Sequence, residues 1–164
     1  LAVPAGVAAV PVESTGELLM AMLAHCEAQD IIIQAAAPAD YRFETVSDHK
    51  LKKQAGGPLR LTLVENPDVA KAVAERKRTG QTLIGFAAET NDALANAREK
   101  LVRKGLDMIV LNDVTHPGAG FNVNTNIATL MTERRELPLP LMTKRALAER
   151  ILTEALTLRR AARG

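Results

Sequence analysis

Aromatic residues are nearly absent from this sequence. It contains no tryptophan, one tyrosine and three phenylalanines, so aromatic residues make up 2% of its 164 residues. The apolar fraction of 47% therefore comes mostly from Ala, Leu and Val. Such a composition favours helices packed on a sheet over an aromatic-rich β-sandwich, and the length predicts a single domain, residues 1–164, with a sizeable core.

Cysteine is almost missing as well. Cys26 is the single cysteine, which excludes a disulfide framework and a zinc site built from several cysteines. It stands within an apolar helical pattern, where the expected role is that of a small buried hydrophobe in a reducing compartment rather than a catalytic thiol. We therefore expect a cytoplasmic protein.

Two classes of partner are disfavoured by what the sequence lacks. No apolar run reaches the roughly 20 residues that a membrane-spanning helix needs. The 21 basic and 19 acidic residues nearly balance, and the formal net charge of +2 is too low for a non-specific nucleic-acid binder. We expect no contact with membranes or nucleic acid, and any attraction for anions has to be local.

Common nucleotide-binding and catalytic fingerprints are also missing. Neither the G-x-G-x-x-G pattern of dinucleotide binding nor the G-x-x-x-x-G-K-[ST] phosphate loop occurs. The three histidines, His25, His49 and His116, are scattered and show no H-E-x-x-H or Ser/His/Asp spacing. The sequence therefore identifies no metal ligands.

What is present is a regular alternation of strand and helix patterns. Strands are expected at residues 7–12, 30–36, 59–65, 82–89, 107–114, 126–133 and 136–142. Helices are expected at residues 13–29, 66–78, 91–104 and 144–163. Strands that alternate with single helices imply parallel βαβ units. The prediction is an α/β, Rossmann-like, doubly wound fold with a mostly parallel sheet and helices on both faces.

Several helix ends carry clear signals. Ser14 and Glu17 have capping-box spacing. Asn66 is expected to cap the next helix, with Pro67 as its first residue. Gly105 is expected to end the helix that contains Lys100 and Lys104.

Ligands of doubly wound sheets bind at the carboxyl ends of the strands, and the long loop of residues 35–57 begins there. It holds Asp40, Lys50, Lys52 and Lys53, and loops of this length are commonly functional. The K-x-K-K run is consistent with an ordinary solvated loop. Taken alone, the run favours the solvated loop, but its place at the binding edge of a doubly wound sheet also suits a cationic flap that closes over phosphates.

Two further stretches fall at the same edge of the predicted sheet. Glu65–Asp68 opens a helix, which capping alone can explain, although helix N–H groups at this place could also bind an anion. Phe86 follows Gly85, whose presence in a strand suggests close approach by another group. Lys100 and Lys104 lie four residues apart and either compensate the helix dipole or reach over the sheet edge toward an anion. The apolar stripe of that helix is formed by Leu94, Ala97 and Leu101.

Seven short stretches together resemble a known family. In chain order they are "AAAPADYR", "KLKKQ", "ENPDV", "GFAAET", "AREKLVRKGLD", "NDV" and "GFNVNTN". They resemble the phosphopantothenoylcysteine synthetase domain of bacterial coenzyme A biosynthesis, over a range from about Val12 to the last helix. In many bacteria that domain is the C-terminal half of a bifunctional protein that also carries a flavin-dependent decarboxylase.

The resemblance implies a ligase that joins 4'-phosphopantothenate to L-cysteine with CTP and Mg²⁺. The substrate carboxylate attacks the α-phosphate of CTP to give an acyl-cytidylate and pyrophosphate, and the cysteine amine then displaces CMP. Cations that offset the repulsion between two polyanions, and a lid that excludes water, suit this chemistry. The resemblance also implies a homodimer, for which residues 137–142 are the expected interface.

Carried over position by position, the nucleotide contacts of the family fall on a defined set: Asp40, Lys50, Pro67, Asp68, Val69, Ala70, Phe86, Lys100 and Lys104. The resemblance gives Lys50 of the K-x-K-K flap the catalytic role, and the flap resembles that of the bacterial CTP-using branch rather than the ATP-using eukaryotic one. The backbone around Asp40 is expected to help recognise the cytosine.

The sequence departs from the family at two places. Pro38 stands where the family often has Val, which stiffens the loop but leaves Asp40 in place. The strand, Gly- and Ser-rich turn and helix with which the family begins are not found in this sequence. The chain is therefore expected to be an N-terminally incomplete domain that binds nucleotide weakly and is inactive by itself.

Two other functions stay open. A non-catalytic, nucleotide-binding Rossmann-like module fits the incomplete domain. An NAD(P)-dependent reductase fits the topology but lacks the Gly-rich fingerprint. Preference for CTP with Mg²⁺, for no particular nucleotide, or for a nicotinamide would separate the three.

Overall fold

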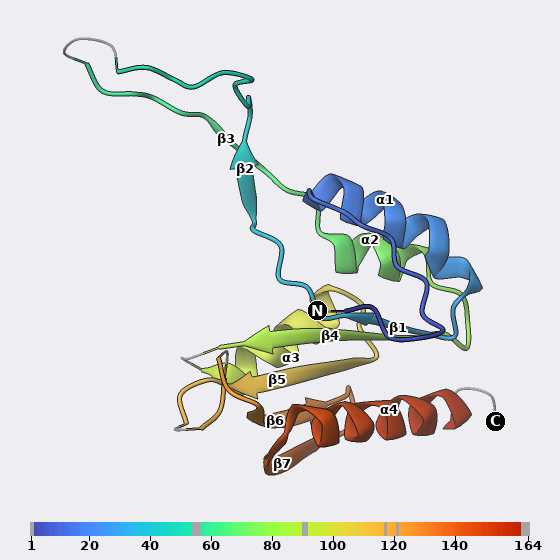
Figure 1. Ribbon diagram of the computed structural model, residues 1–164. Helices are drawn as coiled ribbons and strands as arrows, with labels where there is room; N and C mark the ends of the chain where they lie inside the picture. The colour runs from blue at the N-terminus through green and yellow to red at the C-terminus, as the bar shows by residue number, and fades with distance from the viewer. Residues whose placement is uncertain (1, 54–56, 90–91, 117, 121, 162–164) are drawn as a thin grey trace.

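The computed structural model describes residues 2–53, 57–89, 92–116, 118–120 and 122–161 (Figure 1). Gly56 of the long loop, Asn91 at the predicted helix start and Phe121 of the last motif lie outside these residues.

A five-stranded sheet forms the centre of the molecule, in the order β1-β4-β5-β6-β7 (Figure 1). The strands are β1 (Ile31–Gln34), β4 (Thr82–Ala88), β5 (Met108–Asp113), β6 (Thr125–Met131) and β7 (Glu136–Thr143). β1, β4 and β5 pair in parallel, whereas β6 is antiparallel to both of its neighbours. Four of the five strands therefore point the same way, which confirms the mostly parallel sheet.

Helices cover both faces of this sheet, as the predicted fold requires. α1 (Thr15–His25), α2 (Val69–Arg76) and α3 (Ala93–Arg103) contribute side chains to one apolar cluster, together with the short 3-10 helix Cys26–Ala28. α4 (Lys144–Ala161) packs on the opposite face. Cys26 is 3% exposed and belongs to the first cluster, so its predicted burial is confirmed.

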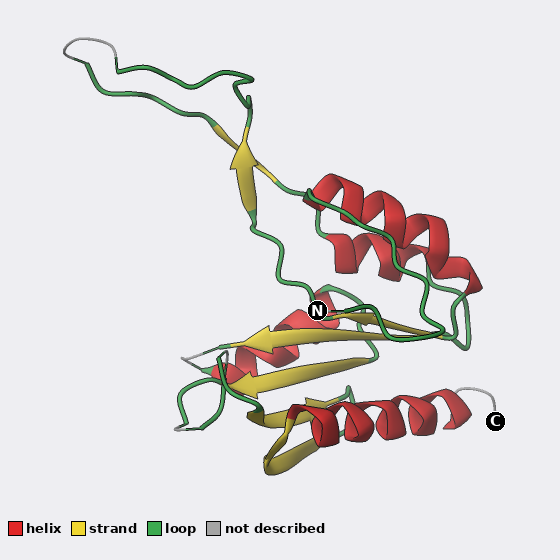
Figure 2. Cartoon of the chain, viewed as in Figure 1, coloured by secondary structure: helices red, strands yellow, loops and turns green. Residues whose placement is uncertain are grey.

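A narrow arm, which we define as residues 41–53 and 57–65, projects away from the body of the molecule (Figures 1 and 2). Its base is an antiparallel pair formed by β2 (Tyr41–Phe43) and β3 (Leu63–Glu65), separate from the main sheet. The predicted strand at residues 59–65 is therefore too long, since only residues 63–65 form a strand and this strand pairs outside the main sheet. The strand β2 is not among the predicted ones. Sequence patterning indicates that a segment is extended but not which partner it pairs with.

The strand predicted at residues 7–12 is wrong. The segment is exposed and outside regular structure, although its Val-rich composition suits a strand. β1 pairs with β4 along one edge, and no strand in the described part of the chain pairs along its other edge. The β-branched run at residues 31–33 is typical of a strand covered on both faces, but Ile33 of β1 is 39% exposed, so this strand is covered only in part.

The helix caps are confirmed with one exception. Both halves of the capping box between Ser14 and Glu17 are present, and Gly105 has the positive φ of 64° that favours glycine after a helix. Asp68, not Asn66, caps α2, with its side chain accepting a hydrogen bond from the backbone N–H of Lys71, and the first residue of the helix is Val69 rather than the predicted Pro67. Asn66 is instead hydrogen-bonded to the loop that follows β1.

Two predictions concern the packing of β4 and α3 beside the cavity end of the sheet. An added Cβ at Gly85 would lie 2.6 Å from Cδ1 of Leu106, so the predicted close approach is that of a core side chain. Ala97 and Leu101 are buried, as expected, but Leu94 is 48% exposed. The predicted apolar stripe of α3 therefore packs against the sheet only from the second turn of the helix onward.

Candidate functional site

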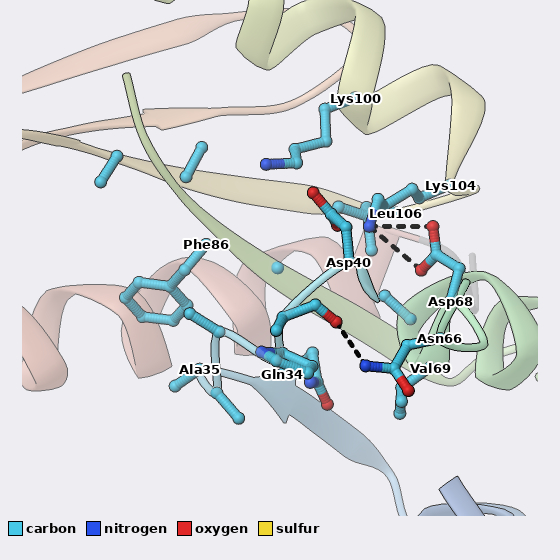
Figure 3. Close-up of a pocket in the computed structure, with 18 of the residues that line it drawn as sticks. Gln34, Ala35, Asp40, Asn66, Asp68, Val69, Phe86, Lys100, Lys104 and Leu106 are labelled. Carbon is cyan, nitrogen blue, oxygen red and sulfur yellow. Dashed lines mark hydrogen bonds and ion pairs between the residues drawn. The ribbon is translucent and has the colours of Figure 1, made fainter. Parts of the chain in front are cut away.

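A cavity of about 530 Å³ opens where the carboxyl ends of β1, β4 and β5 meet the N-terminus of α2 and the last turn of α3 (Figure 3). This size is typical of small-molecule sites. Eight of the nine predicted contact residues line it: Asp40, Pro67, Asp68, Val69, Ala70, Phe86, Lys100 and Lys104.

Lys50 is the predicted residue that the structure does not bring to the cavity. It is exposed on the arm, outside regular structure, and the arm points away from the body (Figure 1). The assignment of a catalytic role to Lys50 stays a prediction that depends on movement of the arm.

The last turn of α3 supplies the positive charge of the site. Nζ of Lys104 lies 3.0 Å from Oδ1 and 2.9 Å from Oδ2 of Asp68, and Nζ of Lys100 lies 3.6 Å from Oε1 of Glu89. Each lysine therefore has its own carboxylate, which offsets the repulsion expected between two cations four residues apart. An incoming anion would compete with these carboxylates for the ammonium groups.

The pKa of Asp68 reflects its place in this charge pattern. Partial burial, the largest single influence, raises the pKa. Hydrogen bonds from Lys104 and from the backbone N–H of Lys71, with the charges of Lys104 and Arg103, together lower the pKa below its usual value. Asp68 is therefore an anion at neutral pH and holds Lys104 at the cavity.

The N-terminus of α2 forms a second wall. Asp68 also accepts, through its backbone oxygen, the N–H of Ala72. The first N–H groups of a helix have no acceptor inside it, so those of Val69 and Ala70, which line the cavity, can bind an oxygen of a ligand. The two expected roles of this stretch, capping and anion binding, are compatible.

Asn66 positions the loop that carries Asp40. Its Nδ2 donates to the backbone oxygen of Ala39 at 2.8 Å, and its backbone N–H donates to that of Asp40 at 2.7 Å (Figure 3). Arg42 donates to the backbone oxygen of Glu65 and so ties the base of the arm to the same place. Sequence reasoning missed this role because Asn before Pro-Asp resembles a helix cap.

Phe86 on β4 and Asn112 on β5 line the cavity from the carboxyl ends of these two strands. Phe86 packs against the apolar cluster under α4 and also lines the cavity, so its role as a nucleotide contact stays a prediction that its position allows. Asn112 lines the cavity from the end of β5 and accepts a hydrogen bond from Asn126. Asn112 stands in the quoted "NDV" motif, but the prediction did not select it.

Metal ligands and membrane spans are not found in the described part of the chain. No group of three His, Cys, Asp or Glu side chains in these residues is arranged to hold a metal ion. Among the same residues, no helix is both long and apolar enough to cross a membrane.

A known family shares this sequence pattern. The profile of the DNA/pantothenate metabolism flavoprotein C-terminal domain matches residues 1–158. The chain belongs to this family. The resemblance drawn from the seven stretches is thereby confirmed at the level of the family.

Members of the family with curated names extend the comparison. The coenzyme A biosynthesis bifunctional protein CoaBC of Bacillus subtilis is 45% identical over 152 residues, which are 91% of this chain and 36% of that protein. CoaBC of Escherichia coli K12 is 41% identical over 159 residues, or 96% of this chain and 39% of that protein. The chain thus spans less than half the length of these relatives.

A solved structure supports the fold. The crystal structure of the C-terminal domain of a CoaBC protein is 35% identical, with a TM-score of 0.77 over 96% of this chain and 71% of that one. The Rossmann-like α/β fold expected from the sequence is therefore confirmed.

Proposed function

We propose that this chain is the nucleotide-binding part of a phosphopantothenoylcysteine synthetase of coenzyme A biosynthesis, a CTP-dependent phosphopantothenate–cysteine ligase. The observation that supports this most is the convergence of eight predicted nucleotide contacts, from four separate stretches of sequence, on one cavity. A cytoplasmic location and a flavin-dependent decarboxylase in the same longer protein are part of this proposal; the naming of the relatives as bifunctional proteins of coenzyme A biosynthesis supports a second activity.

The proposed reaction has two steps. A carboxylate oxygen of 4'-phosphopantothenate attacks the α-phosphorus of CTP and releases pyrophosphate, which gives an acyl-cytidylate. The amine of L-cysteine then attacks the acyl carbon, releases CMP and loses a proton as the amide forms. Both steps bring anions together, so fixed positive charge and exclusion of water are what a protein can contribute.

The residues of the cavity divide this work among them. Lys100 and Lys104 would bind phosphate oxygens in exchange for Glu89 and Asp68, with the N–H groups at the start of α2 as further donors. The loop at Asp40, held by Asn66, would contact the cytosine. Lys50 would reach the phosphates when the arm folds over the cavity, which is the flap motion expected from the sequence.

Mg²⁺ would enter bound to the triphosphate rather than to a site built from this chain. The donor set supports this: Asp40 and Asp68 are the carboxylates among the described lining residues, and Asp68 is already bonded to Lys104 and to the N–H of Lys71. Mg²⁺ commonly binds phosphate oxygens and keeps several waters. Lys100 and Lys104 would then neutralise the part of the negative charge of the triphosphate that Mg²⁺ does not balance.

Calorimetric titration tests the proposal directly. The chain is expected to bind CTP with Mg²⁺ saturably and to bind ATP and NADPH far more weakly. Lys100→Ala should weaken CTP binding by about tenfold, because a charge-assisted hydrogen bond contributes about 1.5–3 kcal/mol. Lys144→Ala, an exposed lysine on the far helix, serves as the matched control and should bind as the unaltered chain does.

The outcomes separate the candidate functions. Equal binding of CTP and ATP would favour a non-catalytic nucleotide-binding module, for which the position of Lys50 outside the cavity is the supporting observation. Preference for NADPH would favour a reductase. If Lys100→Ala binds CTP as the unaltered chain does, CTP binds at a place other than this cavity.

We also propose that two copies of the chain associate through the arm. Seven apolar side chains of the arm are at least half exposed: Tyr41, Phe43, Val46, Leu51, Leu59, Leu61 and Leu63. An isolated two-stranded ribbon is marginally stable in water, and exposed aromatic and aliphatic side chains in this number are typical of interfaces. A second copy offers the same apolar arm, so the two surfaces are self-complementary.

The interface expected at residues 137–142 is less favoured by the structure. Leu139 is 7% exposed and lies in the core cluster, with Leu137 and Met142 packed against it. Pro138 and Pro140 of the edge strand β7 have no N–H to offer another strand.

Light scattering after gel filtration would test the arm as the interface. We expect a mass of twice 17.6 kDa for the unaltered chain and a monomer for Phe43→Glu, because the charge would be buried in the interface. Leu141→Glu, at a 47% exposed position of β7, should remain dimeric. The opposite pattern would place the interface at β7, and a monomeric parent chain would contradict the proposal.

A further inference from the structure

The orientation of one amide in the cavity follows from a chain of hydrogen bonds. The backbone N–H of Ile127 donates to the side chain of Asn126 at 3.0 Å. A backbone N–H can only donate, so the atom of Asn126 that it meets is Oδ1. The other end of that amide is Nδ2, and it lies 2.9 Å from the side chain of Asn112.

The same logic passes to Asn112. Because Nδ2 of Asn126 can only donate, the atom of Asn112 that receives it is the oxygen Oδ1. The NH₂ group of Asn112 therefore points away from Asn126. Asn112 lines the cavity, and no other described group forms a hydrogen bond with its side chain, which leaves two N–H donors available to a ligand.

We propose that Asn126 is a positioning residue that holds Asn112 as a hydrogen-bond donor toward an acceptor oxygen of the bound nucleotide. Asn126 cannot act on the ligand itself, since it is 7% exposed. It is held at an irregularity of the β6–β7 pairing, between Asn126 and Ala128. Ile127 lies within this irregularity, and the hydrogen bond from its N–H to Oδ1 of Asn126 fixes the orientation of both amides.

This inference rests on the proposed function, because the probe is CTP with Mg²⁺. In Asn126→Asp, one oxygen of the new carboxylate keeps the hydrogen bond from Ile127 and the other faces Asn112. Asn112 must then turn its NH₂ group toward that carboxylate and present its oxygen to the cavity. We expect CTP to bind about 30-fold more weakly to this variant, and only about threefold more weakly to Asn126→Ala, in which Asn112 stays free to donate.

The ranking of the two variants is the decisive readout. If Asn126 were merely structural, the isosteric Asn126→Asp would bind CTP at least as tightly as Asn126→Ala. That result would overturn the proposal. Adding Asn126→Asp to Asn112→Ala should cause no further loss. A full further loss there would assign the effect to the negative charge introduced by the substitution and would also overturn the proposal.

Two controls complete the design. If Asn126→Asp fails to fold, as judged by circular dichroism, Asn112→Asp and Asn112→Ala at the more exposed position test whether a donor is needed; wild-type affinity in both would overturn the proposal. Titration with cytidine distinguishes the source of the acceptor oxygen. A loss seen with CTP and not with cytidine assigns it to the phosphates, and an equal loss assigns it to the nucleoside. Failure of the parent chain to bind CTP would count against the proposed function itself.

Discussion

Replacing Lys104 by alanine is expected to weaken the binding of CTP by about 100-fold, the largest effect of any single substitution at the cavity. A charge-assisted hydrogen bond contributes about 1.5–3 kcal/mol, and about 1.4 kcal/mol corresponds to tenfold in affinity. The upper part of this range applies because the substitution removes a cation and also leaves the carboxylate of Asp68 without its partner. That carboxylate would then repel the phosphates.

The double variant Lys104→Ala with Asp68→Asn separates the loss of the Lys104 cation from the repulsion between the Asp68 carboxylate and the phosphates. Asparagine removes the charge that Lys104 no longer balances, and its Oδ1 can still accept the N–H of Lys71 that caps α2. We expect the double variant to recover about tenfold of the lost affinity. Lys104→Arg, which keeps the charge, should bind within about threefold of the parent chain.

Calorimetric titration of the parent chain and of the three variants with CTP tests these expectations, with Lys144→Ala as the control for net charge. If the double variant binds CTP no better than Lys104→Ala, then Asp68 does not face the phosphates and the arrangement proposed for the site is wrong.

Replacing Leu83 by alanine is expected to lower the free energy of unfolding by about 3–4 kcal/mol. Leu83 lies on β4, between β1 and β5, and is 0% exposed. It belongs to the cluster that holds α2 and α3 against the sheet. The substitution removes buried methyl groups and leaves a cavity that the surrounding strands cannot close.

Leu94→Ala is the matched control, because the same atoms are removed from a side chain that is 48% exposed. Urea unfolding followed by far-ultraviolet circular dichroism should give a loss of about 0.5 kcal/mol or less for this variant. Equal losses at the two positions would mean that Leu94 is packed as the sequence pattern predicts, and that the burial described for α3 is wrong.

Much of the fold was predictable because its signals are local. The capping box at Ser14, the glycine after α3 and the β-branched run of β1 each depend on neighbours within a few residues. The alternation of such elements was enough to predict a doubly wound α/β fold. The errors occur where a segment depends on a partner far away in sequence, as at residues 7–12 and in the arm.

The candidate site was predictable through the motifs and not through physical patterning alone. Composition and spacing indicated a small anion at the sheet edge, and the family resemblance selected the nine residues. The structure brings eight of them together. Gln34, Asn66 and Asn112 also line the cavity and were not selected, since a lone amide side chain in a sequence has no preferred interpretation.

The sequence by itself determined where the helices α1–α4 and the strands of the main sheet lie, and it predicted, without deciding, that Lys100 and Lys104 bind an anion. The tertiary structure alone decided what those lysines contact, that Asn66 binds the loop instead of capping α2, and which way the amide of Asn112 points. The physical reason is the range of the interactions. Caps and periodic patterns act over three or four residues, whereas the Lys104–Asp68 and Asn126–Asn112 contacts join residues 36 and 14 positions apart and exist only after the sheet has formed.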